Sequence, residues 1–535
     1  MAAAGATAED AATTRAKPTV LSGLMRGTFW LALRTPLQAA FTLVSFSMTV
    51  AAIGADRYGA YQFALSFGFL QFLLEFGMSS AMQRRVAEAW AQGDRPGVDR
   101  AVSCGLSFYL VAALAQAAAL LGIAYFAAPH TDYRGDSAAL IRKLLWLQAL
   151  TSPCYGLATV AASVLQAAGR YSFIPRLEVG IVIFRFLILW GGLSAGVDFF
   201  LIFAAQTAVQ IGLSLAPAYA MMVRELGHLP RLLGARWEDY RSLMHISFYM
   251  FLMQLSVVMA TSVDMTILGF GLDDPGPGTT LYKAVSTPFL QIRQTGWMLA
   301  YLVMPAVASL SASRDSAALD RVKYDGTRYL VALLLPVGLL AAVYAHPFLR
   351  IWANPKIAEG AWLMRLFLVA TLPLVLSVLV QMAIGVGRIE VVSLSALGGS
   401  LVNLPLSWYL TLRLGVSGVI WGTVLTTLAS NMVVPGIYVF RVLNVSVPIF
   451  ARRTLGAPLL GGAALLGAAA LLHLAGASAE PMGAGLARRW GPLAGHLALG
   501  VAAYGLGYAA SPTGRADAGA LWAKVRRRPT LPTAG

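Results

Sequence analysis

A series of long apolar runs, separated by short loops, constrains the fold of this chain more than any other feature. We count about fourteen such runs, each close to the roughly 20 residues that a helix needs to cross the hydrocarbon core of a bilayer. Lipid cannot hydrogen-bond a peptide backbone, and the runs are continuous rather than alternating, so helices are favoured over a barrel. The runs cover residues 28–53, 58–80, 102–127, 143–166, 177–196, 199–223, 242–270, 281–311, 328–349, 362–384, 391–412, 417–440, 455–475 and 491–511.

The composition agrees with this pattern. Only 12% of the residues are charged and 58% are hydrophobic, whereas soluble domains carry roughly 25% charged residues. We therefore predict an all-α integral membrane protein with about fourteen transmembrane helices. No connecting loop is long enough for a folded soluble domain.

The basic residues are distributed unevenly between the loops. If the N-terminus is inside, the inner segments hold 26 Lys and Arg residues and the outer segments hold 11. Cytoplasmic loops are enriched in Lys and Arg, so this bias predicts an inner-membrane protein with both termini in the cytoplasm. The net charge of +16 thus reflects membrane orientation, and we expect no nucleic-acid partner. No short apolar segment with a cleavage site precedes the first run, which predicts an uncleaved first helix.

Landmark residues recur at a nearly constant offset, which indicates an internal repeat. The pairs are Gly59–Tyr61 with Thr280–Tyr282, Pro153 with Pro373, Gly169–Arg170 with Gly387–Arg388, and Gly196–Val197 with Gly415–Val416, at offsets of 221, 220, 218 and 219. Six helices per copy is an even number, so both copies should insert in the same direction. We predict two six-helix lobes related by a pseudo-two-fold axis along the membrane normal, with two further C-terminal helices.

This organisation gives five segments. They are a cytoplasmic N-terminal tail over residues 1–27, an N-lobe over 28–223, a C-lobe over 242–440, two appended helices over 455–511 and a basic cytoplasmic tail over 512–535.

Five polar residues in the first predicted helix share one face. Arg34, Gln38, Thr42, Ser45 and Thr49 follow one another at steps of four, four, three and four residues, within an arc of about 80°. A polar stripe along a membrane helix indicates that the helix lines a wet cavity. The alternative is hydrogen bonding between helices by small hydroxyl groups.

Two further arginines lie near the middle of predicted helices. A charge at the bilayer centre costs about 2.5–3.5 kcal/mol on insertion scales, so such residues normally face a cavity or a partner. Arg185 has Glu178 on roughly the same helix face, which leaves a structural ion pair open as an alternative. Arg293 lies between Gln291 and Gln294. Because guanidinium presents a planar fork of donors, we interpret Arg34, Arg185 and Arg293 as a candidate anion-binding site.

Two carboxylates and a second polar stripe complete the candidate residues. Glu75 and Asp264 are candidates for gating or for coupling to an ion, with a structural or gating role favoured for both. Ser247, Gln254 and Thr261 form a stripe at heptad spacing on the predicted helix over 242–270. We expect Gln254 to line the cavity together with Gln38, Thr42, Ser45, Gln291 and Gln294.

Several kinds of chemistry find no support in the sequence. There is no phosphate-binding G-x-x-x-x-G-K-[ST] loop and no G-x-S-x-G nucleophile elbow. The histidines are scattered without metal-ligand spacing, and we interpret Cys104 and Cys154 as small core residues. We therefore expect no enzyme, no catalytic residues, no metal and no cofactor.

Several short motifs, taken in order, resemble one known family. They are Arg57 to Tyr61 (RYGAY), Glu75 to Met78 followed by Arg84 and Arg85, Val263 to Gly269 followed by Leu281 and Tyr282, Trp352 to Leu366, and Gly387 to Gly418. Together they are similar to the polysaccharide-export (Wzx-type) flippases of the multidrug/oligosaccharidyl-lipid/polysaccharide (MOP) exporter superfamily. The resemblance covers roughly residues 22–445, and it departs from the family at Glu75, where the family usually has Asp.

The resemblance implies a function. Such a protein carries an undecaprenyl-diphosphate-linked oligosaccharide across the inner membrane by alternating access, for O-antigen or exopolysaccharide synthesis. It also implies a coupling proton or sodium ion, membrane lipids as surroundings, and a polysaccharide polymerase and chain-length proteins as candidate partners. The alternatives are a multidrug or cation antiporter or a lipid II flippase of the same superfamily, and, from a different class, a membrane glycan polymerase or ligase.

Overall fold

The computed structural model describes residues 8–526 except 233–235, 242–250, 252–254, 256–258, 260–262, 302, 304–306, 308–309, 311–315, 389 and 484. The chain divides into two compact units, residues 1–280 and 281–535. We describe each unit by itself.

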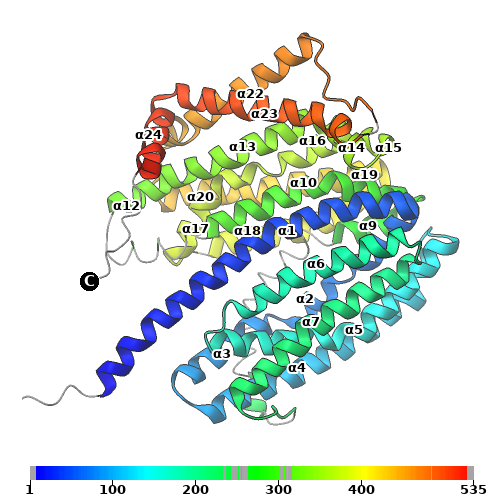
Figure 1. Ribbon diagram of the computed structural model, residues 1–535, viewed down its shortest axis with the longest axis vertical. Coiled ribbons are helices and arrows are strands. Elements are labelled where there is room, and N and C mark those ends of the chain that lie inside the picture. Colours follow the sequence, from blue (N-terminus) through cyan, green and yellow to red (C-terminus); the bar gives the residue numbers. More distant parts are fainter. Residues whose placement is uncertain are drawn as a thin grey trace, which may run out of the picture. The chain divides into compact units, whose positions relative to one another are not determined.

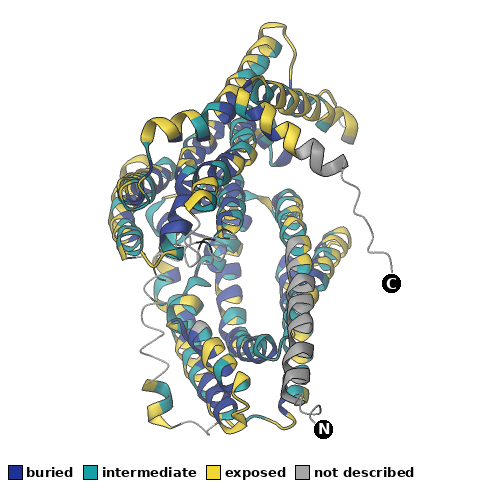
Figure 2. Cartoon of the chain, turned by 90° about the vertical axis from the view of Figure 1, so that its left-hand side faces the viewer, coloured by how far each residue is buried: buried dark blue, intermediate teal, exposed yellow. Residues whose placement is uncertain are grey.

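The protein is an all-helical, multi-pass membrane protein, as predicted. The described residues contain no strand, and ten of their helical segments are long and apolar enough to cross a membrane. Large apolar side chains are exposed in helix interiors, including Leu114, Leu150 and Leu201, and exposed and buried residues alternate along the helices (Figure 2). The expected count of about fourteen stays a prediction, because the runs over 242–270 and 281–311 extend outside the described residues.

The first helix of the N-terminal unit is longer than its apolar run. Helix α1 spans Ala8–Ser66 and therefore includes part of the expected N-terminal tail. It is interrupted at Gly54, whose φ of 81° and ψ of 166° are not helical, so the first two predicted helices meet there without a loop. A glycine suits this kink because it has no Cβ to clash at positive φ.

The second predicted helix, over 58–80, is broken into pieces. The last turns of α1 are followed by α2 (Phe69–Glu75) and α3 (Met78–Ala91). Between them, Phe76 (φ 49°) and Gly77 (φ 71°) adopt the left-handed conformation, which ends a helix. Hydropathy did not detect this break, because Phe and Gly are compatible with an apolar run.

Four long helices form the body of the N-terminal unit and lie side by side in Figure 1. They are α4 (Arg95–Gly122), α5 (Gly135–Ala167), α6 (Phe173–Ser194) and α7 (Phe199–Leu226), with a π-helical turn η1 (Ile123–Ala127) and a 3-10 turn η2 (Ala128–His130) after α4. Asp94 caps α4 by accepting a hydrogen bond from the N–H of Gly97, and Asp198 caps α7 by accepting one from the N–H of Phe200.

The N-terminal unit also contains α9 (Val263–Gly271) and the first turns of α10 (Pro275–Tyr301). Gly59 of α1 lies against Gly276 and Thr279 of α10, so closely that a Cβ at Gly59 would collide with the backbone of Gly276. The hydroxyl of Thr280 donates to the carbonyl of Ala55 at 2.5 Å. The two glycines therefore permit a close helix crossing, as small residues do at membrane helix interfaces.

The C-terminal unit continues α10 and is entirely helical over its described residues. Its elements are α12 (Ser316–Arg321), η3 (Val322–Gly326), α13 (Thr327–Val343), α14 (Ala345–Trp352), α15 (Pro355–Ala358), α16 (Ala361–Val369), η4 (Leu372–Leu376), α17 (Ser377–Gly385), α18 (Glu390–Leu414), α19 (Val416–Leu428), η5 (Ala429–Val433), α20 (Val434–Val442), α21 (Val447–Ile449), η6 (Phe450–Leu455), α22 (Gly456–Leu474), α23 (Leu486–Ala510) and α24 (Pro512–Arg526).

The predicted helix over 362–384 is not continuous. Pro373 falls in the 3-10 turn η4, which separates α16 from α17. Proline removes a backbone donor and clashes with the preceding turn, which explains the break. The helices α22 and α23 pack side by side (Figure 1), and a cluster containing Leu340, Leu465 and Leu493 joins them to α13.

One pair of the sequence landmarks forms the same turn twice. Gly169 (φ 78°) and Gly387 (φ 80°) follow α5 and α17. The N–H of Arg170 donates to the carbonyl of Leu165 at 2.8 Å, and the N–H of Arg388 donates to that of Ala383 at 2.8 Å. This six-to-one bond after a left-handed glycine is the Schellman cap. Its occurrence at corresponding places supports the predicted repeat.

Candidate functional site

Arg34 is paired rather than isolated. Its Nε lies 3.1 Å from Oε2 of Glu178, so the pair links α1 to α6. Both side chains stay partly accessible, at 38% and 32% exposure. The sequence had offered Glu178 as a partner for Arg185, seven residues further along the same helix. In the structure Glu178 pairs with Arg34 instead, because α1 packs against α6.

Arg185 lies inside the N-terminal unit among aromatic side chains. Its guanidinium sits 5.4 Å from the ring centre of Phe41 on α1, and its charge acts on the hydroxyl groups of Tyr61 and Tyr155. Within the described part of the chain, its buried Nε has no hydrogen-bond partner and no carboxylate pairs with Arg185. The cation–π contact stabilises the charge in part and leaves hydrogen-bond donors available.

The stripe on α1 faces inward. Thr49 is 4% exposed, and Thr42 donates to the carbonyl of Gln38 at 2.8 Å. The Oγ of Ser45 is buried and has no hydrogen-bond partner among the described residues, and Gln38 is half-buried. Phe41, which contacts Arg185, lies on this same face of the helix. The stripe and Arg185 therefore belong to one polar region between α1 and α6, and its lining of a wet cavity stays a prediction.

Arg293 lies on α10 in the C-terminal unit. Its guanidinium is 5.5 Å from the ring centre of Phe289, one turn earlier on the same helix. Arg293 and Gln291 are half-buried, and Gln294 is exposed. Arg34 and Arg185 belong to the other unit, so a joint anion site of the three arginines stays a prediction.

Lys283 is a further cation that the list of candidate residues did not include. The structure places it within α10, which begins at Pro275, and its side chain is half-buried. Lys283, Thr287, Gln291 and Gln294 follow one another at steps of four, four and three, the same spacing as Arg34, Gln38, Thr42 and Ser45. This spacing was the signal that could have identified Lys283, which lies at the very start of the apolar run over 281–311 and therefore looked like a helix end rather than part of a stripe.

The two carboxylates have different surroundings. Glu75, the last residue of α2, accepts a hydrogen bond from the hydroxyl of Tyr109 on α4 at 2.8 Å. Asp264, in the first turn of α9, is 1% exposed. The neighbouring Thr266 shares a 2.9 Å hydrogen bond with Ser66 at the end of the first helix. A carboxylate this deeply buried is a suitable site for a proton or a small cation.

Part of the predicted site cannot be placed. Gln254, together with Ser247 and Thr261, lies outside the described residues. Within the described part of the chain, no group of three or more His, Cys, Asp and Glu side chains is arranged to hold a metal ion.

A MatE family model matches residues 31–190, the stretch that contains the α1 stripe, Glu178 and Arg185. A solved lipid II flippase, MurJ, in an inward closed conformation superposes with a TM-score of 0.67 at 13% identity, covering 89% of this chain and 97% of that chain. An inward-facing multidrug resistance MATE family transporter of the MOP superfamily superposes with a TM-score of 0.60 at 13% identity, covering 76% of this chain and 96% of that chain. The chain has the MOP fold. An outward-facing MATE family transporter superposes with a TM-score of 0.50 at 15% identity, covering 79% of this chain and 97% of that chain.

The MOP fold confirms one part of the resemblance seen in the sequence. The apolar runs and the internal repeat had predicted a two-lobed, all-helical fold, and the superpositions bear it out. The narrower Wzx-type assignment stays a prediction, because a likeness at 13–15% identity concerns the fold alone. No curated protein matches the chain.

Proposed function

We propose that this protein is a flippase that carries an undecaprenyl-diphosphate-linked oligosaccharide across the inner membrane. The observation that carries the proposal is Arg185, a half-buried arginine whose buried Nε has no hydrogen-bond partner and whose charge no carboxylate neutralises within the described part of the chain. An uncompensated charge in a membrane helix costs several kcal/mol, on the order of 3 by insertion scales. Such a cost is offset when an anionic ligand enters.

The chemistry of the proposed substrate fits this residue. A diphosphate is a compact anion, and guanidinium binds phosphate oxygens through two parallel hydrogen bonds. Arg34 and Arg293 supply further cations, one in each unit. The polyprenyl tail can stay in the lipid while the polar head crosses the membrane. Glu75 and Asp264 then serve as gating or ion-coupling groups for a proton or a sodium ion.

The relatives support a transport role of this kind without naming the substrate. One of them is a lipid II flippase and two are multidrug transporters. A multidrug or cation antiporter would bind cations, and a half-buried arginine that no carboxylate neutralises among the described residues disfavours such ligands. A lipid II flippase carries the same kind of diphosphate, so it remains the second candidate. A glycan polymerase or ligase would need catalytic groups, and the sequence provides no motif for them.

The proposal is tested by deleting the gene and complementing it with single variants. We expect the deletion to remove surface polysaccharide and to leave undecaprenyl-linked oligosaccharide on the cytoplasmic face. Wild-type protein should restore the polysaccharide, whereas Arg185→Ala and Arg293→Ala should not. Arg185→Lys keeps the charge but loses the fork of donors, so it should restore only part of it.

The control is Arg134→Ala, which removes an exposed arginine at the start of α5 and should restore full polysaccharide. Protein levels are compared by immunoblot. Full polysaccharide with Arg185→Ala at the wild-type protein level would remove the anion site. Lysis on deletion, with lipid II accumulating instead, would favour the second candidate.

A further inference from the structure

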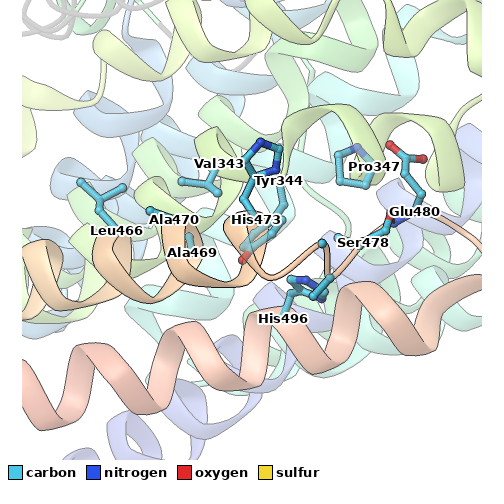
Figure 3. A pocket seen from close by; sticks show the side chains of 13 residues that line it. Val343, Tyr344, Pro347, Leu466, Ala469, Ala470, His473, Ser478, Glu480 and His496 are labelled. Atoms are coloured by element: carbon cyan, nitrogen blue, oxygen red, sulfur yellow. Dashed lines mark hydrogen bonds between the residues drawn. The ribbon is translucent and has the colours of Figure 1, made fainter.

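A second polar region lies in the C-terminal unit, far along the chain from the residues discussed above. It is a cavity of about 690 Å³ between the end of α13, the start of α14, the end of α22, the loop after it, and α23. Figure 3 shows Tyr344, His473 and His496 around this cavity. The charge bias of the loops assigns this end of the unit to the outside of the membrane. Its volume falls within the range of small-molecule sites, about 300–1,000 Å³.

Three polar groups in the cavity wall are available to a ligand. Among the described residues, none makes a hydrogen bond to the hydroxyl of Tyr344 or to the ring of His473. His496 bonds through Nδ1 to the carbonyl of Pro492 at 2.8 Å, and its buried Nε2 has no partner in the described part of the chain. Since a carbonyl only accepts, the proton of the neutral ring lies on Nδ1, and Nε2 is an acceptor. Buried polar atoms are normally satisfied, so Nε2 of His496 in particular indicates a place for a ligand, whereas His473 is exposed.

The acidic residue of the wall is already neutralised. Oε1 of Glu480 lies 2.8 Å from Nδ1 of His346, and Oε2 lies 3.0 Å from Nη1 of Arg350. Among the described residues that line the cavity, no other carries a carboxylate, an ammonium or a guanidinium group. The cavity wall therefore has no uncommitted charge with which to bind a strongly anionic or cationic ligand.

The rest of the wall is apolar. Val343, Leu466, Ala469 and Ala470 line one side, opposite the polar groups (Figure 3). The hydroxyl of Tyr344 can both donate and accept a hydrogen bond. The cavity thus combines a donor, an acceptor and a histidine ring that can act as either, beside an apolar surface.

We propose that this cavity binds a neutral sugar unit of the translocated oligosaccharide on the outer side of the membrane. A sugar hydroxyl both donates and accepts, so neighbouring hydroxyls satisfy Tyr344 and Nε2 of His496 together. The C–H faces of a sugar ring suit the apolar wall. An acyl chain would leave Tyr344 and Nε2 of His496 unsatisfied, which disfavours a lipid tail as the occupant. The inference rests on the proposed function, because it takes its ligand from that function.

The test measures binding of a defined probe to the purified full-length protein in lipid nanodiscs. The probe is the repeat-unit oligosaccharide released by mild acid from the surface polysaccharide of the host, and binding is followed by saturation-transfer NMR. We expect Tyr344→Phe and His496→Phe each to weaken binding at least tenfold. His496→Gln restores an acceptor and should recover much of it. Arg134→Ala, an exposed position in the other unit, should bind the probe like the wild type.

Each outcome bears on the inference. Wild-type protein that does not bind the probe, or binding unchanged in both His496→Phe and Tyr344→Phe, overturns it. Thermal unfolding of each variant shows whether the fold is kept, and His496→Gln provides a second reading if His496→Phe does not fold. Failure of the proposed function has a separate signature, namely normal surface polysaccharide in the deletion strain. Glycerol phosphate, tested in parallel, shows whether a lipid headgroup competes, and stronger binding of that compound also overturns the inference.

Discussion

At the scale of single residues, the two arginines of the N-terminal unit differ in how their charge is compensated. Arg34 has a carboxylate 3.1 Å away on another helix, whereas the described surroundings of the Arg185 guanidinium are aromatic rings. The carbonyl of Arg185 accepts a 2.8 Å hydrogen bond from Gln206 of α7, which fixes the backbone but not the charge. Arg185 is therefore the better candidate for an anion ligand, and Arg34 has a structural role in addition to any binding role.

The Arg34–Glu178 pair predicts non-additive effects on stability. We expect Glu178→Gln alone to lower the thermal unfolding temperature, because it leaves Arg34 uncompensated between two helices. The double variant Arg34→Gln, Glu178→Gln should recover part of the loss, with a coupling energy of about 1 kcal/mol. Thermal unfolding of the four proteins in detergent gives this value. Strict additivity would mean that the pair contributes nothing to the fold.

At the scale of helices, close contacts depend on particular glycines. Gly59 allows α1 to approach the first turn of α10, whereas other glycines, such as Gly122 at the end of α4, have open space where a Cβ would lie. The two positions look alike in the sequence. Only the packing of a distant segment distinguishes them.

The crossing at Gly59 predicts a selective effect of a single methyl group. Gly59→Ala should destabilise the protein by at least about 1–3 kcal/mol, because the added Cβ must push two backbones apart. Gly122→Ala is the matched control and should be neutral or slightly stabilising. The unfolding temperatures of both variants check this. Equal temperatures for the two would show that the helices separate without cost.

A cluster of charges fixes the C-terminal helix α24. Asp517 accepts hydrogen bonds from Nε and Nη2 of Arg328 at 2.9 and 2.8 Å, and from the hydroxyls of Tyr329 and Tyr508. Arg328 and Asp517 are 7% and 9% exposed. Asp325 bridges Arg328 and Arg453 with bonds of 2.8–3.0 Å. The residues expected to form a basic tail therefore include a helix that is anchored in the unit.

The anchoring predicts a large effect of neutralising Asp517. Asp517→Asn takes a carboxylate partner away from the buried guanidinium of Arg328, and we expect the free energy of unfolding to fall by roughly 3–5 kcal/mol. Asp320 pairs with Lys323 at 2.8 Å but is 56% exposed, so Asp320→Asn should cost less than about 1 kcal/mol. Chemical denaturation of the two variants makes the comparison. A similar small loss in both would show that α24 is not held by this cluster.

At the scale of the whole molecule, orientation follows from where the positive charges lie along the chain. The charge bias predicts that Arg515, at the start of α24, is cytoplasmic and that Asp132, between α4 and α5, faces outward. Both residues are exposed. They therefore report the orientation of one end of each unit.

Cysteine labelling tests this orientation. In a background where Cys104 and Cys154 are replaced by Ala, Asp132→Cys should react in intact cells with a maleimide that does not cross the membrane. Arg515→Cys should react only after the membrane is permeabilised. The cysteine-free parent measures background labelling. The reverse pattern would invert the topology and place the proposed sugar cavity on the cytoplasmic side.

The class of the protein, its helical architecture and the repeat follow from the order of amino acids alone. These properties depend on the length of apolar runs, the number of charges in the loops and the positions of glycine and proline, all of which are local. The same information identified Arg185 and Arg293 as charges within membrane helices. It did not detect the break at Phe76 and Gly77, because both residues are compatible with a continuous apolar run although they adopt positive φ.

Which charges are compensated depends instead on how the helices pack. Glu178 could pair with an arginine on its own helix or on another, and the packing of α1 against α6 selected Arg34. Lys283 lies inside α10, which begins six residues before the predicted run, and Asp517, predicted to be in a tail, lies in a buried cluster. The partner of a side chain depends on helices that are remote in the sequence but adjacent in space, and a pattern of single residues contains no such distances.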